Sequence, residues 1–195
     1  MTATCFVPLC PALESAVSMY DLGTARHSAR VAQAAAAMAR SLDLPHEDVE
    51  ALSWSALLHD LGKLGVSIEL LRKKGSLTES EWADIRRHPA IGAEAVLAIS
   101  AELAPIAQGI RSHHEKWDGT GYPDRNAGRR IPFLARIIAV ADVFDALTHR
   151  RPYRQDTLSP GEAIRELQRG AATHFDPDLV AVFIDVFGRG MIPFP

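Results

Sequence analysis

The sequence predicts an all-α protein built as one domain. Apolar residues recur at helical spacing through most of the 195 residues, and the segments between them are short and rich in glycine and proline. A hydrophobic fraction of 47% with 23% charged residues is typical of a folded globular domain. One hydrophobic core can support a chain of up to about 250–300 residues. We therefore expect a single bundle of about seven to nine helices.

The first two helices are expected over residues 14–42 and 48–60. In the first, apolar positions such as Val31 and Met38 recur within an alanine-rich stretch, and a Leu-Pro pair closes it. The second ends where Gly62 interrupts the pattern.

The middle of the chain contains three further predicted helices. Thr78 followed three residues later by Glu81 has the spacing of a capping box, which indicates a helix beginning at Thr78 and running to residues 88–89. The next two are expected over residues 92–99 and 105–114.

Residues 115–131 are predicted to form the one long loop, because they contain three glycines and a proline within a polar stretch. The strongly apolar segment 133–147 follows. Its β-branched residues would also suit a strand, but its length and its alanines favour a helix. The last two helices are expected over residues 160–169 and 177–187.

Charge and composition exclude several classes of function. The formal net charge is −3, which gives no basic field of the kind that drives general binding to DNA, RNA or anionic membranes. No apolar run approaches the roughly 18 residues that span a bilayer. The two cysteines, Cys5 and Cys10, are too few for a disulfide framework, and the opening residues lack the basic start of a secretory signal. We expect a cytoplasmic protein with a poorly ordered leader over residues 1–13.

The histidines form the main chemical pattern. Two adjacent pairs, His59-Asp60 and His113-His114, stand out among the eight histidines. Successive helix positions point about 100° apart, so one pair can serve two directions around a metal cluster. An aspartate can also share its two oxygens between two metals. A mixed imidazole and carboxylate set suits Fe, Mn, Zn or Ni better than Ca or Mg. Any single histidine, however, is more often a surface or structural residue.

Asp142 lies inside an apolar predicted helix, where a carboxylate facing the core is costly unless it is paired or metal-bound. We favour a metal ligand, while a position on the solvent face stays open. Asp145, three residues further, shares the same general face, and its role is left open between helix surface and support of the ligands. His149 is expected at the surface, with a place at the mouth of the pocket as the alternative.

Taken together, these residues resemble the HD-GYP family, a branch of the HD-domain metal-dependent phosphohydrolases. The resemblance covers about residues 22–185, nearly the whole chain, and implies an all-helical HD-domain bundle over residues 14–195. It is specific because a whole set of motifs recurs in order. The set consists of His27, HDLGKLG at 59–65, His88, HHEKWDGTGYP at 113–123 and RIIAVADVFDALTHRRPYR at 136–154.

The resemblance also implies the residues of the site. Some members hold a third metal through a glutamate at the position of Gly23, so a two-metal centre is expected here, with Fe or Mn first and Zn or Ni as alternatives. Asp60 would bridge the two metals. Lys63, Arg151 and Arg154 match the family's substrate-binding basic residues. The implied metal ligands are His27, His59, Asp60, His88, His113, His114 and Asp142.

The implied activity is hydrolysis of cyclic di-GMP to linear pGpG, GMP or both. A hydroxide held between the metals beside Asp60 would attack phosphorus, and Lys63 would stabilise the developing charge or protonate the leaving 3′-oxygen. Arg151 and Arg154 would hold phosphate. Tyr122 would contact a guanine or fix the loop over the site, and simple packing of Tyr122 is an equal alternative.

Two alternatives remain open. The substrate could be another cyclic dinucleotide such as cyclic GMP-AMP. The chain could instead be a catalytically silent signalling module that binds the nucleotide or a GGDEF-type partner, since the family's loop at 118–123 is proposed to contact GGDEF-type cyclase domains. A homodimer is also kept as an alternative.

Overall fold

The structure is a computed structural model, and it describes residues 13, 15, 19, 22–73, 75–149 and 157–192. Most of the predicted leader, together with Arg151 and Arg154, lies outside these residues. The described part is helical with no strand, apart from one isolated bridge between Ala171 and Phe175, which confirms the all-α prediction. None of the described helices is both long enough and apolar enough to cross a bilayer.

The helices are α2 (Leu22–Ser41), α3 (His46–Leu58), α4 (Ile68–Leu71), α5 (Glu79–Ile85), α6 (His88–Ile99), α7 (Ala104–Ser112), α8 (Phe133–Thr148), α9 (Pro160–Gly170) and α10 (Pro177–Gly188). Short 3₁₀ segments are η2 (Leu61–Gly65), η3 (Ala101–Leu103) and η4 (Gly128–Arg130).

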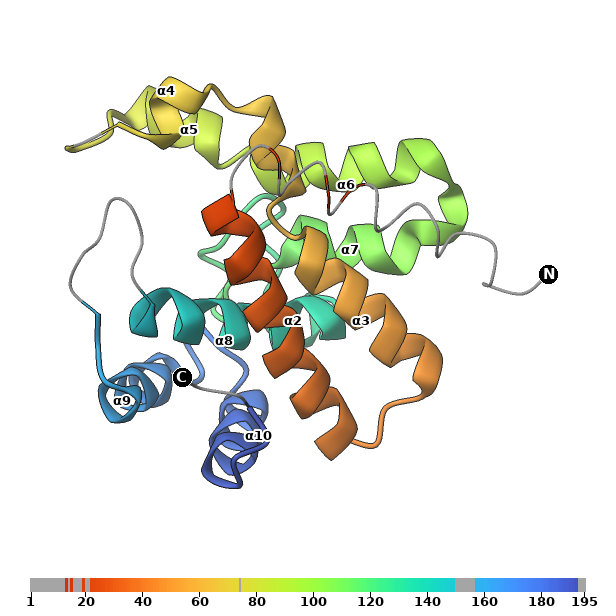
Figure 1. The fold of residues 1–195 in the computed structure, drawn as a ribbon, viewed down its shortest axis with the longest axis vertical. Helices are drawn as coiled ribbons and strands as arrows, with labels where there is room; N and C mark the ends of the chain where they lie inside the picture. The colour runs from red at the N-terminus through yellow and green to blue at the C-terminus, as the bar shows by residue number, and fades with distance from the viewer. Residues whose placement is uncertain are drawn as a thin grey trace.

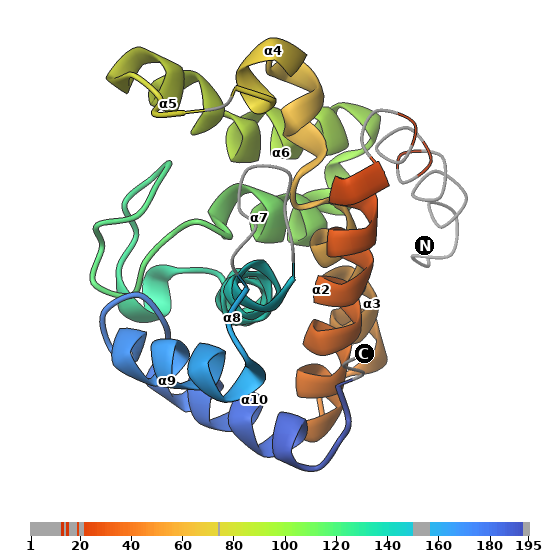
Figure 2. The ribbon, with the colours of Figure 1, turned by 60° about the vertical axis from the view of Figure 1, so that its left-hand side comes forward.

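Helix α8 lies at the centre of the bundle. Figure 2 looks nearly along its axis, with the α2 and α3 pair on one side, α6 and α7 above, and α9 and α10 below. It contacts α2, α3, α7, α9 and α10. Helices α2 and α3 lie side by side, as do α6 and α7, while α4 and α5 project from one end of the molecule (Figure 1). The strongly apolar sequence of α8 is explained by this central position.

The buried apolar side chains form two clusters. The larger joins α2, α3, α8, α9 and α10, and includes Met38, Ile138 and Phe183. The smaller joins the end of α3 with α6 and α7, and includes Leu58 and Ile110. His59 directly follows the smaller cluster's Leu58, and Asp142 directly follows Ala141 of the larger. The polar site described below therefore lies where the two clusters meet.

The structure corrects one predicted helix boundary. The helix expected over residues 78–89 is two helices, because α5 ends at Ile85 and α6 begins at His88. The capping box at Thr78 and Glu81 is confirmed. Pro89, interpreted from the sequence as the end of a helix, instead lies in the first turn of α6, where its missing N–H removes no helical hydrogen bond.

Candidate metal centre

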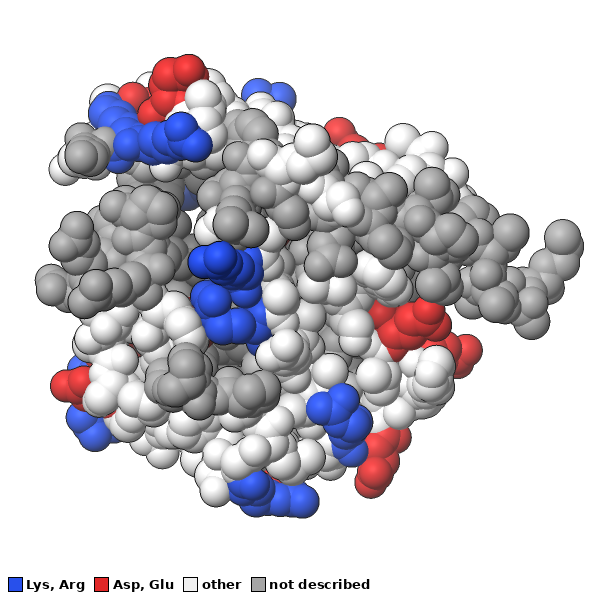
Figure 3. Space-filling view, viewed as in Figure 1, with Lys and Arg blue, Asp and Glu red and all other residues white. Residues whose placement is uncertain are grey.

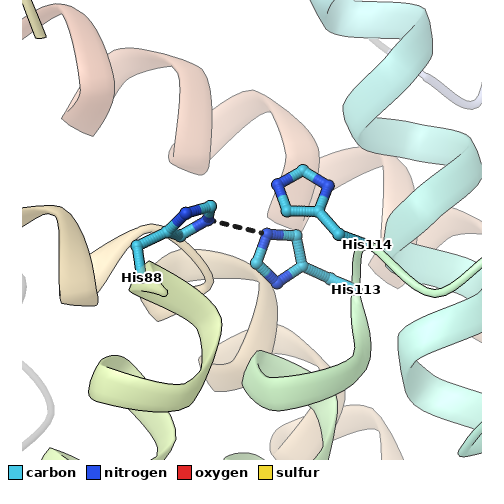
Figure 4. A group of neighbouring side chains, drawn as sticks. All are labelled: His88, His113 and His114. Carbon is cyan, nitrogen blue, oxygen red and sulfur yellow. Dashed lines mark hydrogen bonds between the residues drawn. The ribbon is translucent and has the colours of Figure 1, made fainter. Parts of the chain in front are cut away.

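All seven residues that the sequence suggested as metal ligands come together at one place. Their ligating atoms form three overlapping groups, and within each group the atoms lie within 4.8 Å of one another. Figure 4 shows the imidazoles of one group pointing toward each other from α6 and the end of α7. The groups are His27 with His59 and Asp142, His59 with Asp60 and His113, and His88 with His113 and His114.

Helix ends place most of these side chains. His59 is the C-cap of α3, His113 is the C-cap of α7, and His88 is the first residue of α6. His27 and Asp142 come from within α2 and α8, whose contact brings the two side chains together. Five helices therefore supply a single cluster. His113 and His114, adjacent in sequence at the end of α7, place their rings next to each other, with centroids 4.0 Å apart.

Three of the histidines are fixed by the same contact. Nδ1 of His59, of His88 and of His113 lies 2.6–2.7 Å from a backbone carbonyl oxygen three residues earlier in the chain. These carbonyls belong to the last turns of α3, α5 and α7, which have no helical partner for their final oxygens. Each Nδ1–H therefore donates to a helix-end carbonyl, and this tautomer leaves each Nε2 lone pair for a metal.

Asp60 lies between the two sides of the cluster. Its Oδ1 is 3.4 Å from Nε2 of His88, whereas its Oδ2 is 3.5 Å from Nε2 of His59. Lys63, one turn further along η2, places its Nζ 2.6 Å from the same Oδ2. The two carboxylate oxygens thus face different histidines, which is the arrangement that a bridging ligand needs.

Gly62 makes the approach of Asp60 to α6 feasible. A β-carbon at this position would lie 1.9 Å from the carbonyl oxygen of His88 and 2.6 Å from the backbone nitrogen of Gly92. Only glycine permits η2 to lie this close to the first turn of α6. This contact of backbone with backbone brings Asp60 and His88 to the same centre.

On the opposite side, α8 and α2 form a chain of polar contacts. Nε2 of His27 is 3.0 Å from Asp142, while its Nδ1 is 2.6 Å from Asp145. Arg30 binds both oxygens of Asp145, at 2.6 and 2.9 Å. Asp145 therefore orients His27 from behind, in the way that a carboxylate commonly supports a metal-binding histidine.

His149 also belongs to this chain of contacts. Its Nδ1 lies 3.1 Å from Oδ1 of Asp145, one helical turn earlier, and the residue is only partly exposed. The expectation of a surface position for His149 is therefore wrong. Asp142, Asp145 and His149 follow one another at spacings of three and four residues, so they share one face of α8 and its continuation.

Burial sets the charge state of the cluster. It lowers the pKa of His59, of His88 and of His113 from the ordinary value, and lowers that of His114 to about 3. These imidazoles are therefore neutral near pH 7, as metal binding requires.

The two carboxylates are ionised under the same conditions. Burial alone would raise the pKa of Asp60, but Lys63 and the neighbouring histidines hold it well below its usual range. Burial likewise opposes ionisation of Asp142, while its hydrogen bond to His27 keeps the pKa of Asp142 well below the usual range.

The long loop after α7 brings Tyr122 to the centre. The Tyr122 ring packs against the His114 ring, with centroids 4.9 Å apart. Two contacts hold the loop in place: the backbone N–H of Asp124 donates to the buried Glu115 carboxylate at 2.7 Å, and Arg111 binds the Asp124 carboxylate through two hydrogen bonds. The structure thus places Tyr122 beside a proposed ligand, where it is half-buried.

The donor set fits a pair of divalent transition-metal ions. Five imidazoles and two carboxylates form the cluster, the mixture of nitrogen and oxygen donors that Fe, Mn, Zn and Ni accept. His27 and Asp142 lie on one side and His88 and His114 on the other, with Asp60 facing both sides. The cluster is buried in all its members except His114, which is partly exposed and leaves one side open to solvent.

Sequence reasoning missed two residues that support the surroundings of the centre: Arg30, which binds Asp145, and Glu115, which holds the loop at Asp124. Arg30 and Glu115 were not proposed, although Arg30 lies three residues after His27 on the same face of its helix. That spacing, combined with the three-residue spacing of Asp142 and Asp145, could have indicated that Arg30 pairs with Asp145 behind His27. Glu115 directly follows the histidine pair, and its role depends on the loop returning to it, which no local pattern indicates.

Comparison with known proteins agrees with this geometry. Residues 11–179 match the HD domain family. The chain is 40% identical over 170 residues to the cyclic di-GMP phosphodiesterase response regulator RpfG of Xanthomonas campestris, covering 86% of this chain and 44% of that protein. It is 36% identical over 174 residues to the 3′3′-cGAMP-specific phosphodiesterase 2 of Vibrio cholerae, covering 89% of this chain and 33% of that protein. The chain thus spans less than half the length of either relative.

The fold also matches solved structures. Bd1817, described as an HDG"Y"P protein from Bdellovibrio bacteriovorus, superposes with a TM-score of 0.67 at 21% sequence identity. The match covers 85% of this chain and 52% of that one. At this identity the likeness supports the arrangement of the helices.

Proposed function

This chain belongs to the HD domain family, and from that premise we propose that it is a metal-dependent phosphodiesterase that hydrolyses cyclic di-GMP to linear pGpG, GMP or both. The observation that carries the proposal is the position of Asp60, whose two oxygens face histidines on opposite sides of one buried cluster. The relatives named for cyclic di-GMP and for 3′3′-cGAMP support the choice of a cyclic dinucleotide.

The centre would be held by the seven clustered histidines and aspartates. Two bound divalent ions would lower the pKa of a water molecule and neutralise charge on the phosphoryl oxygens. Lys63, close to Asp60, stabilises negative charge at the reacting phosphate or donates a proton to the leaving 3′-oxygen. Arg151 and Arg154, which lie outside the described residues, hold a phosphate group of the substrate through their planar forks of donors.

We propose Fe or Mn as the metal. Imidazole and carboxylate ligands in one cluster favour Fe or Mn, with Zn or Ni as alternatives. We also place the protein in the cytoplasm, and we expect the loop at 118–123 to contact a GGDEF-type protein partner. Metal analysis of protein purified without oxygen tests the first of these assignments.

Cyclic GMP-AMP is a second candidate substrate. The observation in its favour is the 36% identity to the 3′3′-cGAMP-specific enzyme over 89% of this chain. The metal centre acts on a phosphodiester bond that both nucleotides contain, so it does not itself choose between them.

The deciding experiment compares both substrates with a matched pair of variants. Protein loaded anaerobically with Fe or with Mn is incubated with each nucleotide, and the products are separated by chromatography. We expect D60N to lose at least about 100-fold in rate, because charge stabilisation by metal ions provides several kcal/mol. D185N removes an equal charge from the exposed end of α10 and should leave the rate unchanged.

Two results would contradict the proposal. Intact nucleotide after incubation with the metal-loaded wild-type protein would indicate a silent module that binds the nucleotide or a protein partner. Equal rates for D60N and the wild-type protein would place the chemistry elsewhere.

A further inference from the structure

A stack of three side chains leads from the metal centre to the surface. The Tyr122 ring packs on His114, and the guanidinium carbon of Arg86 lies 5.7 Å from the centre of the Tyr122 ring. The same carbon also lies 5.7 Å from the centre of the Trp82 ring. Trp82 and Arg86 are one turn apart on α5 and its C-cap. We call Trp82, Arg86 and Tyr122 the aromatic–arginine stack.

The outer part of this stack is open to solvent. Trp82 is 46% exposed, which is unusual for so large an apolar side chain, and Arg86 is also exposed. Basic and acidic side chains lie next to each other over α4 and α5 in Figure 3, and Lys73 pairs with Glu81 in this region at 2.7 Å. Among the described residues, no such ion pair involves Arg86. The residue is exposed, so a ligand can reach its guanidinium beside the two rings.

We propose that the aromatic–arginine stack binds a guanine base of the substrate beside the metal centre, with Arg86 selecting guanine over adenine. This inference rests on the proposed function, because it assigns a base-binding role to side chains next to the phosphodiesterase site. Tyr122 connects the metal centre with the outer part of the stack, since it contacts both His114 and Arg86.

The chemistry of the stack favours a base over a phosphate group. A phosphate needs only positive charge and donors, whereas a base also has a flat face that gains from stacking on an aromatic ring. Here the exposed Trp82 ring lies next to the arginine and supplies such a surface. An exposed tryptophan has no use in binding phosphate.

The geometry of the arginine fork favours guanine. Guanine presents two adjacent acceptors, O6 and N7, which match two parallel N–H donors of arginine. Adenine presents the N7 acceptor next to an amino group, so one donor of the fork would face another donor. Arg86 therefore accepts guanine and rejects adenine, while Trp82 stacks on either base.

The test measures binding of single nucleotides, which separates base recognition from hydrolysis. Calorimetry gives the affinities of the metal-loaded wild-type protein and its variants for GMP and for AMP. We expect the wild-type protein to bind GMP about 5- to 150-fold more tightly than AMP, the range for one bidentate contact with a base. R86A and R86K should both lose this preference, because lysine keeps the charge but lacks the fork. W82A should weaken GMP and AMP alike.

R87A provides the matched control, because Arg87 is the next residue and is also exposed, but it is not part of the stack. It should leave the preference for GMP and the hydrolysis rate unchanged. Thermal melting of each variant checks that it is folded.

Several outcomes would overturn the inference. Equal binding of GMP and AMP by the wild-type protein would do so directly. If R86K keeps the full preference for GMP, Arg86 acts through its charge alone. If R86A loses affinity for GMP and for AMP equally, Arg86 binds the phosphate group.

The proposed function is tested separately with bis(p-nitrophenyl) phosphate, a diester without bases. Hydrolysis of this diester by the wild-type protein without any preference for GMP would refute the base site alone. A preference for GMP without hydrolysis of any diester would refute the proposed function alone.

Discussion

Asp145 shows how a single side chain can shape a metal centre without joining it. It contacts His27 through one oxygen and Arg30 through both, so the imidazole, the carboxylate and the guanidinium form one row. Burial opposes ionisation of Asp145, but hydrogen bonds from His27 and Arg30 lower its pKa to about 2. A charged carboxylate therefore fixes the orientation of His27 throughout the physiological pH range.

Replacing Asp145 should weaken the metal centre. We expect D145N to lower metal affinity about 10- to 100-fold, because the amide is a weaker acceptor for the His27 N–H and loses its charge pairing with Arg30. Competition with a chelator of known affinity measures this change. D185N, at an exposed ion pair, is the control. An unchanged affinity in D145N would mean that His27 keeps its orientation through packing alone.

The buried histidines make the stability of the metal-free protein depend on pH. His114 has a pKa of about 3 in the folded protein against an ordinary 6.5, with burial as the main cause. Between these values the unfolded chain binds more protons than the folded one, so stability is greatest above pH 6.5 and falls as the pH falls toward 3. The slope is at most about 1.4 kcal/mol per pH unit for each such histidine.

Urea unfolding of chelator-treated protein at several pH values measures this slope. H114N should flatten it, whereas H46Q, which changes an exposed histidine, should leave it as in the wild-type protein. A slope that is the same in H114N and the wild-type protein would show that His114 is not responsible.

At the scale of single residues, the sequence suggested seven ligands, which lie close together in the structure, and kept Asp145 as a possible support, but Arg30 and Glu115 were not proposed. Adjacent histidine and aspartate pairs, and an aspartate inside an apolar helix, are visible as motifs because metal binding requires those residue types. The contact between His27 and Asp145 joins residues 118 positions apart, and no local pattern encodes it.

Among the elements, the loop between α7 and α8 has a strict steric requirement of its own. A β-carbon on Gly121 would lie 2.3 Å from the backbone nitrogen of Lys116 and 2.6 Å from both Cα of Glu115 and the carbonyl oxygen of His114. The loop therefore packs with its backbone directly against the residues that follow α7. This close packing places the neighbouring Tyr122 on His114.

G121A should displace the loop. We expect a loss of about 1–3 kcal/mol in the free energy of unfolding, as for other overpacked positions, and a loss of about 100-fold in kcat/KM for the dinucleotide. G188A is the control, because a β-carbon there meets no atom within 4 Å. Denaturant unfolding and steady-state kinetics give the two quantities. Wild-type kinetics in G121A would show that the position of Tyr122 has no effect on hydrolysis.

Helix positions were predicted well where the apolar pattern is long, as in α8, and less well where helices are short. Helix α4 has four residues and depends on Ser67, whose hydroxyl accepts the N–H of Leu70, so its apolar positions are too few to form a pattern. The division between α5 and α6 was missed because a proline can end one helix or begin the next. In this protein the packing of η2 against α6 determines that the proline begins a helix.

For the molecule as a whole, the division of the core determines how metal and folding are linked. The length of the chain predicted one domain, but not two apolar clusters with the polar centre at their junction. The proposed ligands at that junction are spread over the chain from His27 to Asp142, so the complete ligand set exists only in the folded state. Metal binding must therefore stabilise the fold.

Removing metal should lower the melting temperature. With metal at 100 times its Kd, the stabilisation is about 2.7 kcal/mol, which corresponds to about 5–10 °C for a chain of this size. Calorimetric melting with and without a chelator measures the shift, and D60N should show a much smaller one. Identical melting of the wild-type protein under both conditions would indicate that the cluster is stable without metal.

The contact between each histidine ring and a helix-end carbonyl affects how related sequences should be compared. His59, His88 and His113 each bind a carbonyl oxygen at a helix end as well as facing the centre. A related protein that had lost the activity would therefore still be under selection to keep these histidines. The Asp60 carboxylate contacts His59, His88 and Lys63 among the described residues and caps no helix end, so its side chain has no such structural task once the metal is lost. Across evolutionary time, the aspartate is therefore the better marker of an active lineage, and the histidines record shared ancestry.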